Sequence, residues 1–176
     1  ADAWANILAG KSGIDLITKF DASNFACRIA GEVKGFDLES YISAKDARAM
    51  DSFIHFGIAA AAQAVQDAGL PTGEALDDEL ATRIACVIGS GIGGLPLIEN
   101  THIEYAARGP RRITPFFVPA SIINMVAGHV SMRFGFKGPN LSVVTACTTG
   151  LHCIGEGGRM IEYSDADIVV AGGTES

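Results

Sequence analysis

Basic charge is scarce in this sequence. Its 176 residues include 13 lysines and arginines against 20 aspartates and glutamates, which leaves a formal net charge of −7. Binding to nucleic acid and to anionic membrane surfaces is driven mainly by basic charge. We therefore expect neither as a partner, and any acidic partner has to meet a local basic patch.

Long apolar runs and paired cysteines are also missing. No apolar run reaches the roughly 18 residues that a membrane span requires. The first residues, Ala1–Trp4, contain neither the basic segment nor the apolar core of a signal peptide. The four cysteines include no CxxC pair and are too few and too scattered for a disulfide scaffold. These absences predict a soluble protein of the reducing cytoplasm.

The residues that are present are sufficient for one well-buried domain. The chain is 48% hydrophobic and 19% charged, and its 21 glycines cluster after apolar runs, as tight turns in α/β proteins do. It lacks an initiator methionine and stops directly after an apolar, strand-like run. We therefore expect residues 1–176 to form a single partial domain cut from a longer chain.

Apolar periodicity predicts helices that alternate with short, continuously apolar strands. Ser43 and Asp46 resemble a capping box at the start of the first helix, and the acidic stretch 74–79 is expected to be a solvated loop. Strands that are apolar on both faces predict a parallel sheet covered by helices on both sides, hence an α/β fold. The helices are expected over residues 46–68, 119–133 and 149–163, and the strands over 84–89, 141–146 and 167–171.

The glycine-rich segment Gly89-Ser90-Gly91-Ile92-Gly93-Gly94 formally satisfies the G-x-G-x-x-G pattern of dinucleotide-binding proteins. Such a unit needs a helix at the third glycine and a second strand that ends in an acid about 20 residues on. That region here reads Arg111-Arg112-Ile113-Thr114-Pro115. A tight turn where backbone segments pack closely is the favoured interpretation, with nucleotide binding as the alternative.

Cys147 lies in the segment Thr145-Ala146-Cys147-Thr148-Thr149-Gly150, between a predicted strand and a predicted helix. Unpaired N–H groups and a partial positive charge at a helix N-terminus favour a thiolate over a thiol. A thiolate is a ready acyl acceptor, so Cys147 is predicted to be a nucleophile. The alternative is that Cys147 is a small buried hydrophobic residue.

The other cysteines and the histidines are predicted to have no catalytic role. Cys153 lies about 240° further round an ideal helix than Cys147, so the two share no face, and Cys27 and Cys86 are expected to be packing residues. Neighbours such as His152 and Cys153 point apart on a helix, and no second ligand pair follows. We expect neither a metal nor a cofactor.

Six segments together carry a resemblance to a known family. They resemble, in order and spacing, the β-ketoacyl-[acyl-carrier-protein] synthases, most closely the synthase II type, and the resemblance covers essentially the whole chain. The segments are Ile88–Gly94, Pro115–Pro119, Asn124–His129, Gly138-Pro139, Thr145–Gly150 and Ala171–Gly173.

The resemblance implies a thiolase-like fold, of which this chain supplies most of the first of two similar halves. It implies that Cys147 takes an acyl group from an acyl carrier protein and condenses it with malonyl-carrier protein, with loss of carbon dioxide. The partner is then an acyl carrier protein bearing phosphopantetheine-linked acyl and malonyl groups, and the whole enzyme is a homodimer. Fatty acids would grow by two carbons in each cycle.

The resemblance also assigns roles to residues away from Cys147. Ile92 looks like the residue that lines and limits the acyl pocket, with Phe117 close to it. Four basic residues match the positions at which such synthases receive the acidic carrier protein. They are Lys45, Arg48, Arg111 and Arg112.

Two departures from the family pattern limit what this chain is expected to do alone. The first strand of the family is absent, and so are the two histidines, the lysine and the glycine-rich phenylalanine loop of the C-terminal half. We therefore expect no condensation by residues 1–176 alone. The alternative functions are another thiolase-fold activity, such as a polyketide condensing domain or a thiolase, and a non-catalytic partner subunit that shapes chain length.

Overall fold

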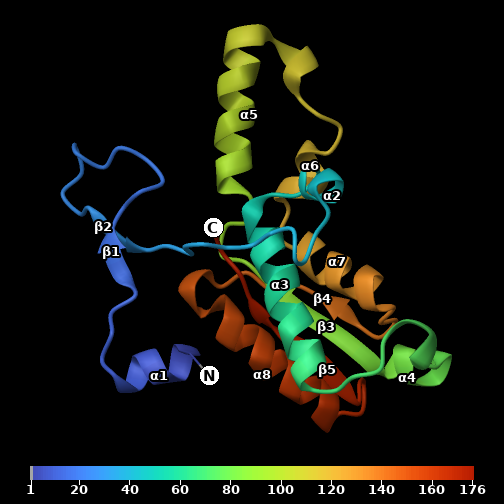
Figure 1. The fold of residues 1–176 in the computed structure, drawn as a ribbon. Coiled ribbons are helices and arrows are strands. Elements are labelled where there is room, and N and C mark those ends of the chain that lie inside the picture. Colours follow the sequence, from blue (N-terminus) through green and yellow to red (C-terminus); the bar gives the residue numbers. More distant parts are fainter. Residues whose placement is uncertain (1) are drawn as a thin grey trace. The chain divides into compact units, whose positions relative to one another are not determined.

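The computed structural model describes residues 2–176, which form two compact units (Figure 1). The first ends at Asp37 and the second is Leu38–Ser176. The first unit contains helix α1 (Asp2–Leu8) and an antiparallel pair of strands, β1 (Ile14–Leu16) and β2 (Ile29–Gly31). All the residues that we discuss as a site belong to the second unit.

A three-stranded parallel sheet forms the centre of the second unit. Its order is β4-β3-β5, with β3 (Ile84–Gly89) between β4 (Asn140–Leu141) and β5 (Ile168–Gly173). The register pairs Gly89 with Gly173 at the carboxyl ends of β3 and β5. The parallel sheet and the strand over 84–89 are confirmed, and the last strand runs from 168 to 173 rather than 167 to 171.

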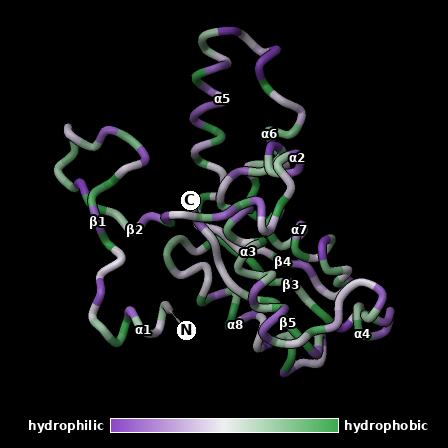
Figure 2. Tube along the Cα trace, viewed as in Figure 1, coloured by the Kyte–Doolittle hydropathy of each residue, from purple (hydrophilic) through white to green (hydrophobic). Residues whose placement is uncertain are grey.

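Helices cover both faces of the sheet, as predicted. The side chains of β3 alternate between two cores, and the hydropathy colouring in Figure 2 follows the apolar run along this strand. Ile84, Cys86 and Ile88 pack with α3 (Ser52–Asp67) and α7 (Met125–Phe134). The intervening Ala85 and Val87 pack with Cys153 and Met160 of α8 (Thr149–Glu162), whose predicted range is confirmed to within one residue.

The helix predicted over 46–68 is in fact two helices, α2 (Ala44–Ala47) and α3. Ser43 does cap the first, because its Oγ accepts from the N–H of Asp46 at 3.1 Å. The helix cannot continue through Asp51, which has extended backbone angles. Asp51 instead caps α3 by accepting from the N–H of Phe53, and its own N–H donates to the carbonyl of Ala120.

The helix predicted over 119–133 is also divided, into α6 (Phe117–Ser121) and α7. Ile122 is extended at the break, where the N–H of Gly94 donates to the carbonyl of Ser121 at 2.9 Å. The glycine-rich turn therefore packs into the interruption. Gly135 ends α7 in a left-handed conformation.

Two further helices lie where no helix was predicted. The expected loop over 74–79 contains a 3₁₀ turn, η1 (Gly73–Ala75), and the start of α4 (Asp78–Arg83), which Asp77 caps. Helix α5 (Leu95–Arg108) was not predicted either, and none of its residues is buried. Between residues 2 and 176, no helix combines the length and the apolar character that crossing a membrane requires.

Candidate active site

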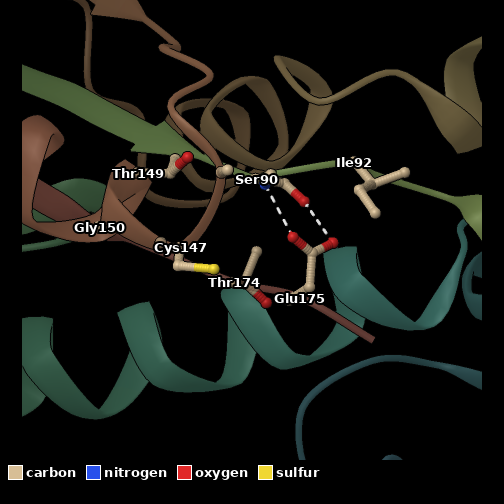
Figure 3. Close-up of a pocket in the computed structure, with 10 residues that line it drawn as sticks. Ser90, Ile92, Cys147, Thr149, Gly150, Thr174 and Glu175 are labelled. Atoms are coloured by element: carbon tan, nitrogen blue, oxygen red, sulfur yellow. Dashed lines mark hydrogen bonds between the residues drawn. The ribbon is translucent and has the colours of Figure 1, made fainter.

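A cavity of about 490 Å³ opens at the carboxyl ends of β3 and β5, beside the first turn of α8 (Figure 3). Ligands of open parallel sheets bind at this end of the strands. Three segments far apart in the sequence meet here because β3 and β5 are paired neighbours. The lining residues are Ser90, Gly91, Ile92, Ala146, Cys147, Thr149, Gly150, Gly173, Thr174 and Glu175.

Cys147 is exposed and lies in a 3₁₀ turn, η3 (Ala146–Thr148), directly before α8. Cys147 thus precedes a helix, as predicted, but the strand expected to lead directly into it ends at Leu141. Figure 3 shows its sulfur directed away from α8, toward Thr174. Ile92 lines the same cavity and is 61% exposed. The alternative of a buried Cys147 is therefore wrong.

The turn that carries Cys147 is strained and is held by a buried hydroxyl. Ala146 has a φ of +51°, which residues with a Cβ seldom adopt and which costs on the order of 1–3 kcal/mol. Thr149 is 3% exposed, and its Oγ1 accepts from the N–H of Thr145 at 2.9 Å. The N–H of Thr148 donates to the carbonyl of Thr145, which closes the turn.

Glycines allow the backbone of α8 to approach the sheet. A Cβ on Gly173 would lie 2.8 Å from the Cα of Gly150, and one on Gly89 would collide with the carbonyl oxygen of Val143. Real Cβ atoms do not tolerate such distances, so glycine is required at these positions. The close packing sets the first turn of α8, and with it Cys147, at the end of the sheet.

The strand expected over 141–146 pairs only at Asn140 and Leu141. Beyond them, Ser142 donates its hydroxyl to the carbonyl of Ile88 at 2.7 Å. The Ser142 side chain thereby binds the carbonyl oxygen of Ile88, which a backbone N–H of the neighbouring strand would otherwise bind. The chain leaves the sheet at this point and turns toward Cys147.

Glu175 is a cavity residue that the sequence analysis did not single out. Its Oε1 accepts from the hydroxyl of Ser90 at 2.9 Å, and its Oε2 accepts from the N–H of Gly91 at 2.7 Å (Figure 3). Gly89 pairs with Gly173, Ser90 follows Gly89 by one residue, and Glu175 follows Gly173 by two. The register of a β3–β5 pair could therefore have indicated that Ser90 and Glu175 lie close together.

Asp51 is a second carboxylate that sequence reasoning missed. It is 6% exposed, accepts from the N–H of Leu97 in the first turn of α5 at 2.9 Å, and accepts from the hydroxyl of Ser176 at 3.3 Å. Together with its bond to Phe53, Asp51 ties the starts of α3 and α5 to the segment that follows β5. The elements around the cavity are thus joined at one buried group.

The other residues singled out from the sequence lie outside the cavity lining. Phe117 is the first residue of α6 and is partly buried. Lys45 lies in α2 with Arg48 as its C-cap, and Arg111 and Arg112 lie in a second 3₁₀ turn, η2 (Pro110–Arg112). All four basic side chains are exposed, and none forms an ion pair within residues 2–176.

The remaining cysteines differ in accessibility. Burial raises the pKa of Cys86 to about 12 and also raises the pKa of the fully buried Cys153. Both are packing residues, as expected for Cys86. Cys27 is exposed, so its prediction as a packing residue is wrong. Its position in an irregular segment with little buried surface leaves the thiol accessible.

The glycine-rich turn departs from a dinucleotide site, although not in the way expected. A helix does begin directly after it, since Gly94 is the N-cap of α5. The chain after α5 enters η2 rather than a strand. The N–H of Gly91, which a phosphate would seek, is already bound by the carboxylate of Glu175. The geometry therefore disfavours the nucleotide alternative.

Comparison with known proteins identifies the class to which this fold and cavity belong. The family model described as "Beta-ketoacyl synthase, N-terminal domain" matches residues 1–176. The chain belongs to this family.

Curated relatives narrow the similarity to one type. The chain is 56% identical over 173 residues to 3-oxoacyl-[acyl-carrier-protein] synthase 2 of Vibrio cholerae, and 50% identical over 175 residues to the protein of the same name from Coxiella burnetii. These matches cover 98% and 99% of this chain but 41% of each relative. The chain thus spans about two fifths of the length of these relatives.

Solved structures confirm the thiolase-like α/β fold. The ishigamide ketosynthase/chain length factor matches 98% of this chain and 42% of its own, with a TM-score of 0.77 and 27% identity. A β-ketoacyl synthase from Burkholderia phymatum matches 96% of this chain and 41% of its own, with a TM-score of 0.76. Its identity is 22%, so this second match shows the fold alone.

Proposed function

We propose that this chain is the N-terminal part of a 3-oxoacyl-[acyl-carrier-protein] synthase in which Cys147 is the acyl acceptor. The observation that carries the proposal is the position of Cys147, which is exposed at the turn before α8 and shares a cavity with Ile92. The similarity to synthases named 3-oxoacyl-[acyl-carrier-protein] synthase 2 supports the type of reaction.

The proposed reaction has two stages. The thiolate of Cys147 first attacks the carbonyl carbon of an acyl thioester on the carrier protein, and the carrier's phosphopantetheine thiol leaves. Malonyl-carrier protein then loses carbon dioxide, and the electron pair that remains on its α-carbon attacks the acyl-cysteine carbonyl. The Cys147 thiolate is released, and the product is a 3-oxoacyl thioester that is two carbons longer.

This chain supplies only part of the machinery for these steps. The N–H of Cys147 is proposed as one donor to the oxyanion, and a donor from the C-terminal part of the enzyme as the other. Loss of one such donor typically lowers the rate about 10²–10³-fold. We therefore propose that residues 1–176 alone can be acylated but do not complete condensation.

The acyl chain is proposed to lie in the cavity beside Ile92. Removal of an alkyl chain from water contributes about 0.8 kcal/mol per methylene, so apolar walls favour its binding. Ile92, in the glycine-rich turn, is part of the lining of this cavity. Phe117 is proposed to meet the chain further from Cys147, because it is not part of the cavity lining.

An acyl carrier protein is the proposed partner, and the docking residues are Lys45, Arg48, Arg111 and Arg112. Their exposure and their lack of ion pairs within the described chain leave their charges available to an acidic surface. One fold neighbour was solved as an acyl-carrier protein in complex with its ketosynthase. A cytoplasmic location is part of the same proposal.

A homodimer is proposed to form along the free edge of β4. This strand pairs only with β3 among the described residues, and Leu141 and Val144 on the segment are about half exposed. Val144→Asp should shift the intact enzyme from dimer toward monomer in light scattering, whereas Leu151→Asp on the exposed face of α8 serves as the control. An unchanged dimer in the first variant would contradict this interface.

The acyl-acceptor proposal is tested in the intact enzyme that contains this chain. Purified enzyme is given acyl-carrier protein and malonyl-carrier protein, and both the 3-oxoacyl product and the acyl mass on each cysteine peptide are measured. We expect the acyl group on the Cys147 peptide and no product from Cys147→Ala. Cys27→Ala is the matched control, because Cys27 is also exposed but lies outside the cavity.

The same assay separates the alternatives. A non-catalytic chain-length partner would carry no acyl group at Cys147, whose presence in an open cavity already weighs against that function. A thiolase would form product without a carrier protein. Full activity of Cys147→Ala would refute the proposal.

A further inference from the structure

A single carboxylate, that of Glu175, anchors the glycine-rich turn that carries Ile92 at Ser90 and Gly91. Glu175 accepts directly from the N–H of Gly91, at 2.7 Å. It also accepts from the hydroxyl of Ser90 at 2.9 Å (Figure 3). That hydroxyl in turn accepts from the N–H of Gly93 at 2.9 Å. Gly91, before Ile92, is therefore held by Glu175 directly, and Gly93, after Ile92, is held through the hydroxyl of Ser90.

The anchoring acts on the part of the turn around Ile92, whereas the end of the turn is held by the bond from the N–H of Gly94 to the carbonyl of Ser121. Gly91 and Gly93 flank Ile92, and glycine populates more backbone conformations than any other residue. Gly93 has a φ of +82°, so its conformation is one that side chains disfavour. Hydrogen bonds to an ionised acceptor are roughly twice as strong as neutral ones, which suits a single carboxylate to fix such a segment.

Within the turn, only Ile92 presents a large side chain to the cavity. Ser90 is 1% exposed, and its hydroxyl is fully engaged with Glu175 and Gly93. A movement of the turn would therefore change the cavity mainly by moving the side chain of Ile92. Figure 3 shows the carboxylate of Glu175 aimed at Ser90 and Gly91 rather than at the sulfur of Cys147.

We propose that Glu175 is a positioning residue that holds Ile92 in place and thereby sets the range of acyl chain lengths that the cavity accepts. This inference rests on the proposed function, in which Cys147 carries the acyl group and Ile92 limits its chain. Glu175 acts through the turn and takes no part in proton transfer to or from the substrate. Loss of its carboxylate frees Ile92 and weakens discrimination between short and long chains.

The test compares Glu175→Ala with Glu162→Ala in the intact enzyme that contains this chain. Glu162 is an exposed acid at the end of α8, outside the cavity. The readout is the ratio of two kcat/KM values, one for a carrier protein loaded with a long acyl chain and one for a carrier protein loaded with a short acyl chain. We expect this ratio to change about fivefold to tenfold in Glu175→Ala, the size that loss of one or two hydrogen bonds allows, and to stay unchanged in Glu162→Ala.

Three further variants identify the route of the effect. Glu175→Gln should restore part of the wild-type ratio, because its amide oxygen can still accept from Gly91. In an Ile92→Ala background, Glu175→Ala should leave the ratio as it is in Ile92→Ala alone. Ser90→Ala removes one arm of the anchor and should change the ratio in the same direction as Glu175→Ala, which provides a second route should that variant fail to fold.

Hydrogen exchange of the peptide over residues 90–97 is measured in parallel, since it does not depend on activity. Exchange should quicken in Glu175→Ala and not in Glu162→Ala, and unchanged exchange would overturn the inference whatever the enzyme assay gives. Equal loss of activity for all chain lengths, or an unchanged ratio, would also overturn it. Failure of the proposed function has a different signature, namely that wild-type enzyme forms no 3-oxoacyl product or carries no acyl group on Cys147.

Discussion

The hydroxyl of Thr149 accepts a hydrogen bond from the N–H of Thr145 at 2.9 Å, across the turn that carries Cys147. The bond joins the last residue before the turn to the first residue of α8. Because Ala146 between them has a positive φ, the turn stores strain that the surrounding contacts have to offset. The position of Cys147 therefore depends on a neighbouring threonine.

Thr149→Val should impair the site while it preserves the shape of the side chain. The variant leaves the N–H of Thr145 without its acceptor, which should lower the free energy of unfolding by about 1–3 kcal/mol. Alkylation of Cys147 should slow as the turn loosens, as followed by peptide mass analysis. Thr148→Val is the control, since the Thr148 hydroxyl makes no cap hydrogen bond. Equal behaviour of the two variants would refute this role of Thr149.

Thiol labelling of the native protein at pH 8 should divide the four cysteines into two pairs. Cys147 and Cys27 are exposed and should react with iodoacetamide. Burial raises the pKa of Cys86 to about 12 and raises that of Cys153, so both should stay protonated and shielded until the chain unfolds. Labelling with and without denaturant, followed by peptide mapping, makes the comparison. Rapid native labelling of Cys86 would contradict the fold.

Ile92→Phe should shorten the longest acyl chain that the intact enzyme accepts. The added volume blocks the cavity, whereas Cys147 and its turn are unaltered. Acylation of Cys147 by carrier proteins loaded with short acyl chains should persist. Product lengths from the variant and from Ile92→Val, a control that removes volume, are read by mass spectrometry. An unchanged product length in Ile92→Phe would remove Ile92 from the acyl pocket.

The ion pair between Arg83 and Asp167 should contribute a pH-dependent increment of stability. The hydrogen bond from Arg83, 2.7 Å long, holds the pKa of Asp167 below its usual value of 3.8. Since the pKa is lowered on folding, the contribution is present above about pH 4 and is lost as the pH falls through the folded-state pKa. Both side chains are partly exposed, so solvent screening keeps the effect small.

The measurement is the difference in Tm between wild type and Asp167→Asn. It should be present at pH 7, diminish in high salt and shrink progressively as the pH falls below about 4. Glu162→Gln, which removes an acid without an ion partner in the described chain, should show no such trend. A difference that is independent of pH would mean that Asp167 acts through packing rather than through charge.

The amino-acid sequence by itself determined the elements whose signals are local. The continuous apolar run over 84–89 became β3, the pattern that starts at Thr149 became α8, and Gly135 ended α7. The placement of Cys147 directly before a helix follows from the same signals. These features depend on the periodicity and the intrinsic preferences of neighbouring residues, which a single sequence displays.

Only the tertiary structure decided the features that depend on bonds between distant residues. The break before α3 is made by Asp51, which also binds Leu97, and the turn under Ile92 is held by Glu175. Their partners lie 46 and 84 residues away in the chain. No local pattern encodes such a bond, because it forms only after β3 and β5 have paired and the helices have packed around them.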